Sequence, residues 1–337
     1  MKDRKVYIDA IKIISIIFVI FNHTGATGFL AYENQTRAWL QILELGVSCL
    51  CKTAVPLFFM CSGALLLEKE KNIIELWKRK ILKYFIVTIF FTLLYYVFLS
   101  WKDGGSINLN WILRFMYENQ TFSYSGSYWF LYSYIGFLMM LPLLRVMAIN
   151  MTSEVFWYIL ILNTLFTGFL PIFQYFTQIG NLAISIPIIT EQAILYPLVG
   201  HYVNKHIEQI GNKDQKIFVM MSIVSMFLSI VLSLNSLIRG NATQSYFGLF
   251  QLYLVIFIFG LAYRMFANYN GALKRIFIEI GNCSFGIYLI HGFVFTILED
   301  EGVLEIHNAG LNTVIVFIIS LFIAGILRKV PILKMLL

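Results

Sequence analysis

Long apolar runs separated by short polar connections extend along almost the whole chain. Ten of these runs come close to the roughly 20 mostly apolar residues that a helix needs to cross the hydrocarbon core of a bilayer. They cover residues 6–30, 45–67, 81–101, 127–149, 155–173, 182–203, 216–237, 246–267, 282–298 and 311–330. Turn-forming residues such as Asp103-Gly104-Gly105 fall between the runs, where connections are expected. The pattern predicts an all-α, polytopic membrane protein with about ten transmembrane helices.

The composition agrees with a membrane protein and excludes most soluble classes. Hydrophobic residues make up 59% of the 337 residues and charged residues only 13%, whereas soluble domains contain about 25% charged residues. The net charge of +7 is spread over short connections, so we expect no nucleic-acid partner. No linker-like tract or repeat divides the chain, and we interpret residues 1–337 as one integral-membrane domain. The four cysteines lie in apolar runs without zinc-ligand spacing, so no metal is expected.

Lysine and arginine are distributed unevenly between the two sides that ten spans define. If the N-terminus is cytoplasmic, nineteen of these residues fall on the cytoplasmic side and four fall outside. The four outside residues are Arg37, Lys102, Arg114 and Arg239. Cytoplasmic connections of membrane proteins carry such an excess, so we predict that both termini are cytoplasmic.

The first run carries three polar residues on one side of its predicted helix. Lys12 and His23 are eleven residues apart, which at about 100° per residue places them within about 20° of each other. Asp9 lies one turn before Lys12, at a spacing that allows an ion pair. Ionisable groups are costly in a bilayer and usually face a bundle interior or a wet cavity. Two interpretations remain open: a functional polar face, or a structural one in which Lys12 reaches the interface beside Asp9 and His23 bonds a neighbouring helix.

Three ionisable residues in other predicted spans are also candidates for a polar interior. They are Lys52 in the second span, Glu191 near the middle of the sixth and His291 in the ninth. Each could be a satisfied contact between helices. Together they indicate a polar interior that a purely structural bundle does not need.

Several segments, in this order, match the pattern of one known family. The polar face of the first run is followed by AVPLFFMCSGALLL (54–67), WKRKILKYF (77–85), SYWFLYSYIGFLMMLPLLR (127–145), Glu191 before YPLVGHYV (196–203), and CSFGIYLIHGFVF (283–295). With these segments the chain resembles acyltransferase family 3, the bacterial membrane O-acyltransferases that modify cell-surface sugars. The resemblance implies a multi-pass protein of the bacterial cytoplasmic (inner) membrane. It also implies transfer of an acetyl group from acetyl-CoA to a hydroxyl of a cell-surface or lipid-linked glycan.

The resemblance assigns roles to individual residues. His23 matches the essential histidine of the family's first helix, and Lys12 stands where arginine is commoner. A lysine keeps the charge but loses the bidentate fork of a guanidinium. We expect the catalytic residues to be His23, Asp9, Lys12 and Glu191. The residues expected to bind coenzyme A are Arg79, Lys80 and Lys83, and those expected to contact the acceptor are Trp129 and His291.

The chemical role of His23 stays open at this point. Imidazole has an unperturbed pKa near neutral pH, so His23 could be the general base or could carry the acyl group transiently. No permanently bound cofactor is expected, because acetyl-CoA is the donor substrate. The expected partners are acetyl-CoA, an acceptor glycan and the lipid bilayer.

A membrane transporter or flippase is the alternative function. An intramembrane line of polar groups serves conduction as well as catalysis. Transporters are often built from inverted repeats with broken helices in matching halves, and we find neither pattern in the sequence. The sequence therefore favours the enzyme, and it leaves the acceptor sugar, the acyl group and the oligomeric state open.

Overall fold

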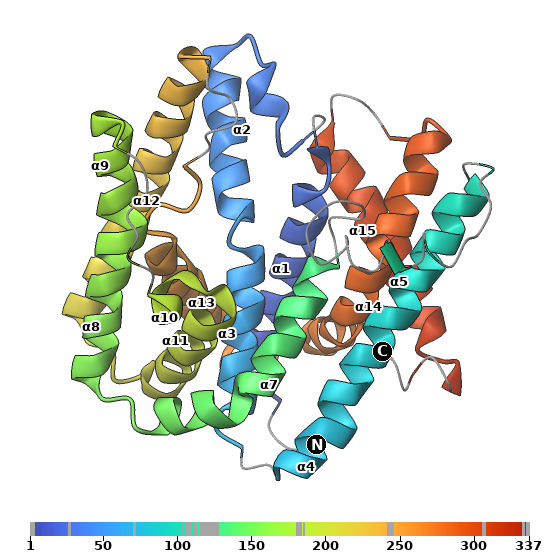
Figure 1. Ribbon diagram of the computed structural model, residues 1–337, viewed down its shortest axis with the longest axis horizontal. Coiled ribbons are helices and arrows are strands. Elements are labelled where there is room, and N and C mark those ends of the chain that lie inside the picture. The colour runs from blue at the N-terminus through green and yellow to red at the C-terminus, as the bar shows by residue number, and fades with distance from the viewer. Residues whose placement is uncertain are drawn as a thin grey trace.

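The computed structural model describes residues 4–25, 28–69, 72–102, 104, 110, 113–114, 128–179, 184, 186–240, 246–304, 308–331 and 334. No strand occurs within these ranges, so the all-α prediction is confirmed (Figure 1). Within the same ranges, seven helical segments are long and apolar enough to cross a membrane. They are Ala38–Leu66, Ile73–Lys102, Trp129–Ile149, Ser153–Thr177, Asn212–Ile238, Lys274–Asp300 and Ala309–Leu327.

Three shorter helices occupy the remaining predicted runs. They are α1 (Val6–Asn22), α11 (Gln192–His206) and α13 (Gln251–Phe266), with 17, 15 and 16 residues. Each of the ten predicted runs therefore contains helix. The polytopic class is confirmed, while the number of spans and the side of each terminus remain predictions.

Two predicted spans are broken into separate helices. The second consists of α2 (Ala38–Cys51) and α3 (Ala54–Leu66), with Lys52 at the break. The sixth consists of α10 (Pro187–Thr190) and α11, and Glu191 lies between them in an extended conformation. The expectation that Glu191 lies near the middle of a continuous helix was therefore wrong.

Two other spans contain a π-helical turn. The third span consists of α4 (Ile73–Leu76), a π-helical turn (Trp77–Ile81) and α5 (Leu82–Lys102). The fifth consists of α8 (Ser153–Asn163), a π-helical turn (Thr164–Phe169) and α9 (Leu170–Thr177). π-helical turns are rare in proteins as a whole, but those that occur are often found at functional sites. Each one changes which side chains share a face of the helix.

The central helix of the bundle is α1 (Figure 1). It contacts α3, α13, α14 (Lys274–Asp300) and α15 (Ala309–Leu327). All residues from 6 to 11 are buried. The first part of the polar face on α1 therefore lies inside the protein rather than against lipid.

The crossing of α3 and α11 is especially close. A β-carbon at Gly63 of α3 would overlap the backbone at Pro197, and a β-carbon at Gly200 of α11 would overlap the backbone at Met60. Small residues allow membrane helices to approach in this way. The crossing holds α3 in place, and α3 forms one wall of the cavity described below.

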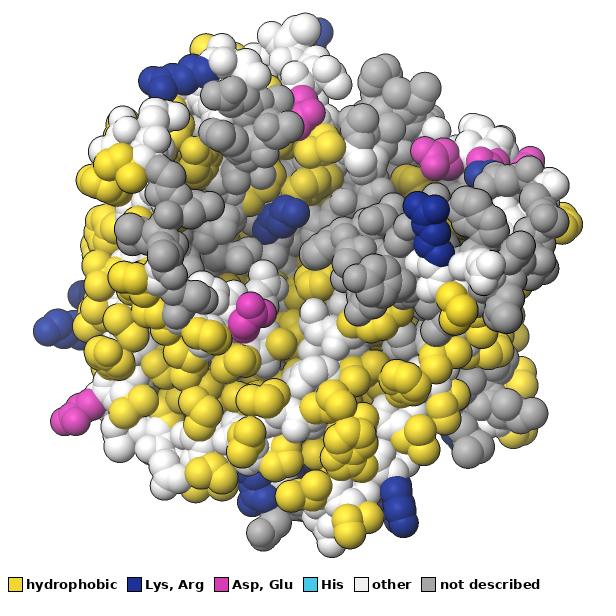
Figure 2. All heavy atoms as spheres, viewed as in Figure 1, with side chains coloured by type: hydrophobic (Ala, Val, Ile, Leu, Met, Phe, Trp, Pro, Cys, Tyr) yellow, Lys and Arg dark blue, Asp and Glu magenta, His cyan; other side chains and the backbone are white. Residues whose placement is uncertain are grey.

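The outward faces of α7 (Trp129–Ile149), α12 (Asn212–Ile238) and α15 are apolar. Leu143 is 60% exposed and Phe322 is 70% exposed. Hydrophobic side chains dominate the lower half of the face in Figure 2, with Lys and Arg side chains at its lower edge. An apolar surface of this extent indicates contact with a membrane.

Candidate active site

His23 lies directly after α1 and forms its C-cap. The chain turns here because Gly25 has a φ of 55°, a left-handed conformation that glycine adopts readily. The Thr24 hydroxyl donates to the Phe21 carbonyl at 2.7 Å and accepts from the Phe29 amide at 3.0 Å. His23 is therefore held on a constrained turn at the end of the central helix.

The structure brings His23 against His291, a buried residue of α14. Nε2 of His291 lies 3.2 Å from Nδ1 of His23, and the ring centroids are 5.1 Å apart at an interplanar angle of 43°. The packing of α14 on α1 brings these distant parts of the chain together. His291 therefore contacts the candidate base directly, while its expected contact with the acceptor stays a prediction.

Backbone carbonyls determine which ring nitrogens carry hydrogen. Nδ1 of His291 lies 2.6 Å from the Tyr288 carbonyl oxygen, and Nδ1 of His23 lies 2.8 Å from the Val19 carbonyl oxygen. A carbonyl oxygen only accepts, so we assign a hydrogen to both Nδ1 atoms. Nε2 of His291 then accepts a hydrogen bond from the Nδ1–H of His23, and the Val19 carbonyl oxygen accepts a second hydrogen bond from the same N–H. In this arrangement the basic lone pair of His23 is on its Nε2.

Asp9 is buried and is paired mainly with Arg4. The Arg4 guanidinium donates to both carboxylate oxygens of Asp9, at 2.7 and 2.8 Å, and to Oδ1 of Asn282 at 2.6 Å. Nζ of Lys12 is 3.9 Å from Oδ1 of Asp9. The predicted Asp9–Lys12 ion pair is therefore confirmed, and the sequence missed the bidentate contact with Arg4, which is the stronger of the two. The hydrogen bond to Asp9 also raises the pKa of Arg4.

A cavity of about 310 Å³ lies between α1, α3, α7, α14 and the π-helical turn before α5. Lys12 and Lys80 contribute positive charge to its wall. The other polar side chains that line it are Ser62, Tyr84, Tyr134, Asn282 and Ser284. Aromatic rings form much of the remaining wall, from Phe58, Phe130, Phe285 and Tyr288. A mostly apolar cavity with a few convergent polar groups is typical of a small-molecule site.

Tyr288 connects this cavity with the histidine pair. It lines the cavity, and its ring centroid is 5.9 Å from that of His291. The Phe130 ring packs edge-on against Tyr288 at 5.5 Å. The Tyr128 hydroxyl donates to the Leu289 carbonyl at 2.8 Å, which ties α7 to α14 at this level. A ligand in the cavity is therefore one aromatic ring away from His291.

A family model described as an acyltransferase domain, that of acyltransferase family 3, matches residues 5–329. The chain belongs to acyltransferase family 3. No curated protein and no solved structure gave a significant match. Membership of the family, together with several apolar helices, identifies a multi-pass membrane acyltransferase.

In this acyltransferase, the three basic residues expected to bind coenzyme A lie in different environments. Lys80 lines the cavity, whereas the Arg79 side chain is 79% exposed and pairs with Glu75 at 3.2 Å. Lys83 is half-buried and is not among the described residues that line the cavity. Neighbouring side chains of a helix point about 100° apart, so the members of this basic segment meet different surroundings. Lys80 and Lys12 are therefore the cations placed to meet a ligand in the cavity.

Glu191 and Trp129 are not among the described residues of the cavity wall. Glu191 is exposed at the break before α11. Trp129 is the half-buried first residue of α7 and packs against the core. The catalytic role expected for Glu191 and the acceptor contact expected for Trp129 stay predictions.

Lys52 lies at the break between α2 and α3, close to the turn that carries His23. Its exposed side chain places Nζ 4.4 Å from the centroid of the Phe29 ring. The adjacent Cys51 carbonyl accepts a hydrogen bond from Nδ2 of Asn22 at 3.0 Å. The break between α2 and α3 is therefore attached to the residue that precedes His23.

Three residues of the site were missed from the sequence: Arg4, Asn282 and Tyr288. Tyr288 precedes His291 by three residues, which is one helical turn, so this spacing was a usable signal. Arg4 and Asn282 gave no such signal, because their contact joins the start of the chain to α14. No group of three or more His, Cys, Asp and Glu residues that could hold a metal ion occurs in the described part of the chain.

Proposed function

We propose that this protein is an O-acyltransferase that moves an acetyl group from acetyl-CoA to a hydroxyl of a cell-surface or lipid-linked glycan, in the inner membrane of a bacterium. The observation that carries the proposal is the histidine pair beside a cavity with two lysines, in a chain of this acyltransferase family. The pair supplies a base, and the cavity suits an anionic acyl donor with a less polar arm.

The charges around the cavity favour an anionic donor. Acetyl-CoA carries its negative charges on phosphates and its acetyl group at the end of a flexible arm. Arg4 makes the two short contacts with the Asp9 carboxylate. The Lys12 ammonium lies in the cavity wall at the longer distance of 3.9 Å from Asp9, so it can also bind a phosphate. Lys80 adds a second cation to the same wall. The aromatic part of the wall would hold the acyl-bearing arm.

His23 acts in this proposal as the general base. Its Nε2 takes the proton of the acceptor hydroxyl while the hydroxyl oxygen bonds to the thioester carbonyl carbon. The tetrahedral intermediate then collapses as the carbon–sulfur bond breaks. The proton passes from Nε2 to the leaving thiolate, which yields the free thiol of coenzyme A and an O-acetyl ester.

The surroundings of His23 support the charge that forms on its ring. When Nε2 takes a proton, the Nδ1–H still points at two acceptors, the Val19 carbonyl and Nε2 of His291. Hydrogen bonds from a charged donor are stronger than those from a neutral donor. Both contacts therefore strengthen during the proton transfer, as transition-state stabilisation requires.

The proposal is tested with purified protein in detergent, isotope-labelled acetyl-CoA and a lipid-linked glycan fraction extracted from bacterial membranes. We expect release of the coenzyme A thiol together with label that alkali removes from the glycan, as an ester does. Protein that consumes no acetyl-CoA and labels no glycan, but moves a solute across reconstituted vesicles, would overturn the proposal in favour of the transporter.

A further inference from the structure

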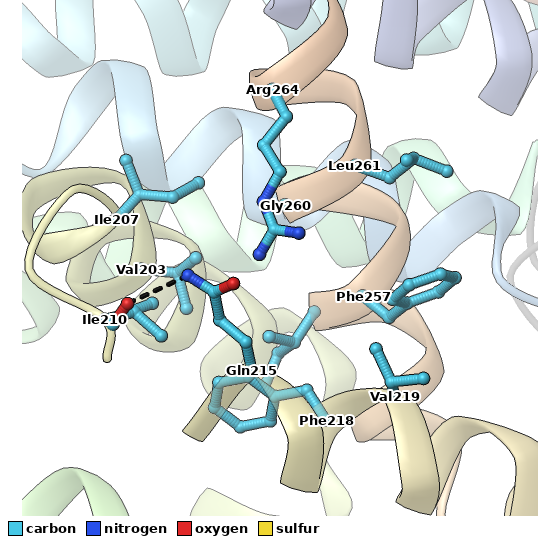
Figure 3. Close-up of a pocket in the computed structure, with 11 residues that line it drawn as sticks. Val203, Ile207, Ile210, Gln215, Phe218, Val219, Phe257, Gly260, Leu261 and Arg264 are labelled. Carbon is cyan, nitrogen blue, oxygen red and sulfur yellow. Dashed lines mark hydrogen bonds between the residues drawn. The ribbon is translucent and has the colours of Figure 1, made fainter. Parts of the chain in front are cut away.

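A second site lies where the first turns of α12 meet α13 and the end of α11. A groove of about 530 Å³ is lined there by Asn212, Gln215, Lys216, Val219, Met220, Ile223, Val224 and Arg264. A narrower cleft continues from it toward Val203 and Ile207 (Figure 3). The volume is within the range of about 300–1,000 Å³ that ligand sites occupy.

The floor of the groove is apolar and open to the surroundings of the protein. Val219, Met220 and Ile223 are 38%, 57% and 65% exposed, and their spacing places them on one face of α12. In the adjoining cleft, a β-carbon at Gly260 of α13 would meet open space beyond its own helix, so the absence of a side chain there leaves the cleft open. In a membrane protein such a surface meets acyl chains rather than water.

The polar end of the groove carries two cations, Lys216 and Arg264. The Arg264 side chain runs along α13 past Gly260 toward Gln215, so its guanidinium lies over the cleft (Figure 3). Arg264 and Gln215 line both the cleft and the groove. Gln215 is held in place by its own hydrogen bond, from Nε2 to the Ile210 carbonyl at 2.9 Å. The ion pairs between described residues include neither cation.

The acidic residues closest in sequence to this end do not line the groove. Glu208 accepts a hydrogen bond from the Tyr263 hydroxyl at 2.6 Å. Asp214 lines a separate cavity together with His206. The positive charge of Lys216 and Arg264 is therefore left for a ligand. Arginine and lysine are the side chains that proteins use to bind phosphate.

We propose that this groove binds one anionic phospholipid of the cytoplasmic leaflet. The phosphate lies between Arg264 and Lys216, and one acyl chain runs along Val219 and Ile223. From Lys216 to Ile223 the helix rises about 10 Å, so a single lipid reaches both ends of the groove. Basic pockets between transmembrane helices on this side of a membrane bind anionic headgroups. A free phosphate ion would leave the apolar floor unused, which is why the proposal commits to a lipid.

Native mass spectrometry of the purified protein tests this site. The probe is an equal mixture of phosphatidylglycerol and phosphatidylcholine with the same acyl chains, which differ in headgroup charge. We expect the wild-type protein to retain phosphatidylglycerol preferentially. The double variant Lys216→Gln with Arg264→Gln should lose about 30-fold of this preference, which equals about 2 kcal/mol at 1.4 kcal/mol per tenfold change.

A charge-matched control separates this site from general attraction to a basic surface. The double variant Lys205→Gln with Lys213→Gln removes two exposed lysines from the same predicted side, and neither lysine lines the groove. It should keep the preference for phosphatidylglycerol. Equal loss in both double variants, or no preference in the wild-type protein, would overturn the proposal. All four side chains are exposed, so both variants should fold, and thermal unfolding in detergent checks this.

Discussion

The two histidines of the pair have different chemical roles, because only one of the two Nε2 lone pairs points at the other ring in the assigned tautomers. The Nε2 lone pair of His291 is turned toward His23 and is used as an acceptor. The Nε2 lone pair of His23 lies on the other side of its ring from Val19. We therefore assign the base to His23 and a positioning role to His291, rather than the reverse.

The positioning role predicts the kinetics of His291 variants. His291→Ala should lower kcat about 100-fold, the loss that a misplacement of about 1 Å can cause, and leave KM for acetyl-CoA nearly unchanged. His291→Gln should recover part of kcat, because the glutamine carbonyl oxygen can accept from Nδ1–H of His23. Steady-state kinetics of both variants checks this. A raised KM for the glycan at normal kcat would instead support the acceptor contact expected from the sequence.

The pairing of Asp9 with Arg4 predicts how a substitution of Arg4 affects donor binding and stability. In Arg4→Gln, Asp9 remains buried and draws Lys12 toward it from 3.9 Å, so KM for acetyl-CoA should rise. Thermal stability should also fall, by less than the about 3–5 kcal/mol of a fully buried broken pair, because the Arg4 side chain is 34% exposed.

The double variant Arg4→Gln with Asp9→Asn is the control for this prediction. It removes the carboxylate that attracts Lys12, so KM should return toward the wild-type value. A KM that stays high in the double variant would mean that Arg4 itself, and not the release of Lys12, affects donor binding.

At the scale of helices, the apolar runs predicted the elements well. A segment that crosses a bilayer must form all its backbone hydrogen bonds within itself, and a helix does this. The breaks at Lys52 and Glu191 left no such signal, since both residues fit within a helical pattern. The sequence also gave no signal for the π-helical turn at Trp77–Ile81, because the residues WKRKI are compatible with an α-helix. Consequently the sequence predicted a basic cluster but not which of its members faces the cavity.

The different environments of two neighbouring residues of the π-helical turn predict different outcomes for their variants. Lys80→Gln should weaken acetyl-CoA binding, because Lys80 lines the cavity. Arg79→Gln should leave binding within about twofold, because Arg79 is exposed and its ion pair with Glu75 is a surface pair, which contributes little. Isothermal titration of each variant with coenzyme A measures both effects. Equal losses in the two variants would show that the charge of the whole segment, and not the orientation of Lys80, matters.

At the scale of the whole molecule, α1 joins the two ends of the proposed reaction path. Asp9 and His23 are about 21 Å apart along the helix axis at 1.5 Å per residue. The cavity with Lys12 lies toward one end, and the histidine turn lies at the other. With the N-terminus in the cytoplasm, as the distribution of lysine and arginine predicts, the donor would enter from inside and the acceptor would approach from outside.

The same topology predicts which residues can be labelled from outside the cell. Single cysteines at Asn308 and Lys334 are introduced into a variant without the four native cysteines, which are buried. A membrane-impermeant maleimide added outside should label the cysteine at position 308 and should not label the one at position 334. The reverse pattern would contradict ten spans with both termini inside.

The most direct test of the central claim measures acetyl transfer and stability together in His23→Ala. Loss of a general base costs about 10²–10⁴-fold in rate, whereas loss of one hydrogen bond between membrane helices costs only about 0.6 kcal/mol of stability. We therefore expect a folded protein that binds acetyl-CoA with nearly normal affinity but transfers acetyl groups at least 100-fold more slowly than the wild type. Near-normal transfer by a folded His23→Ala protein would contradict the account.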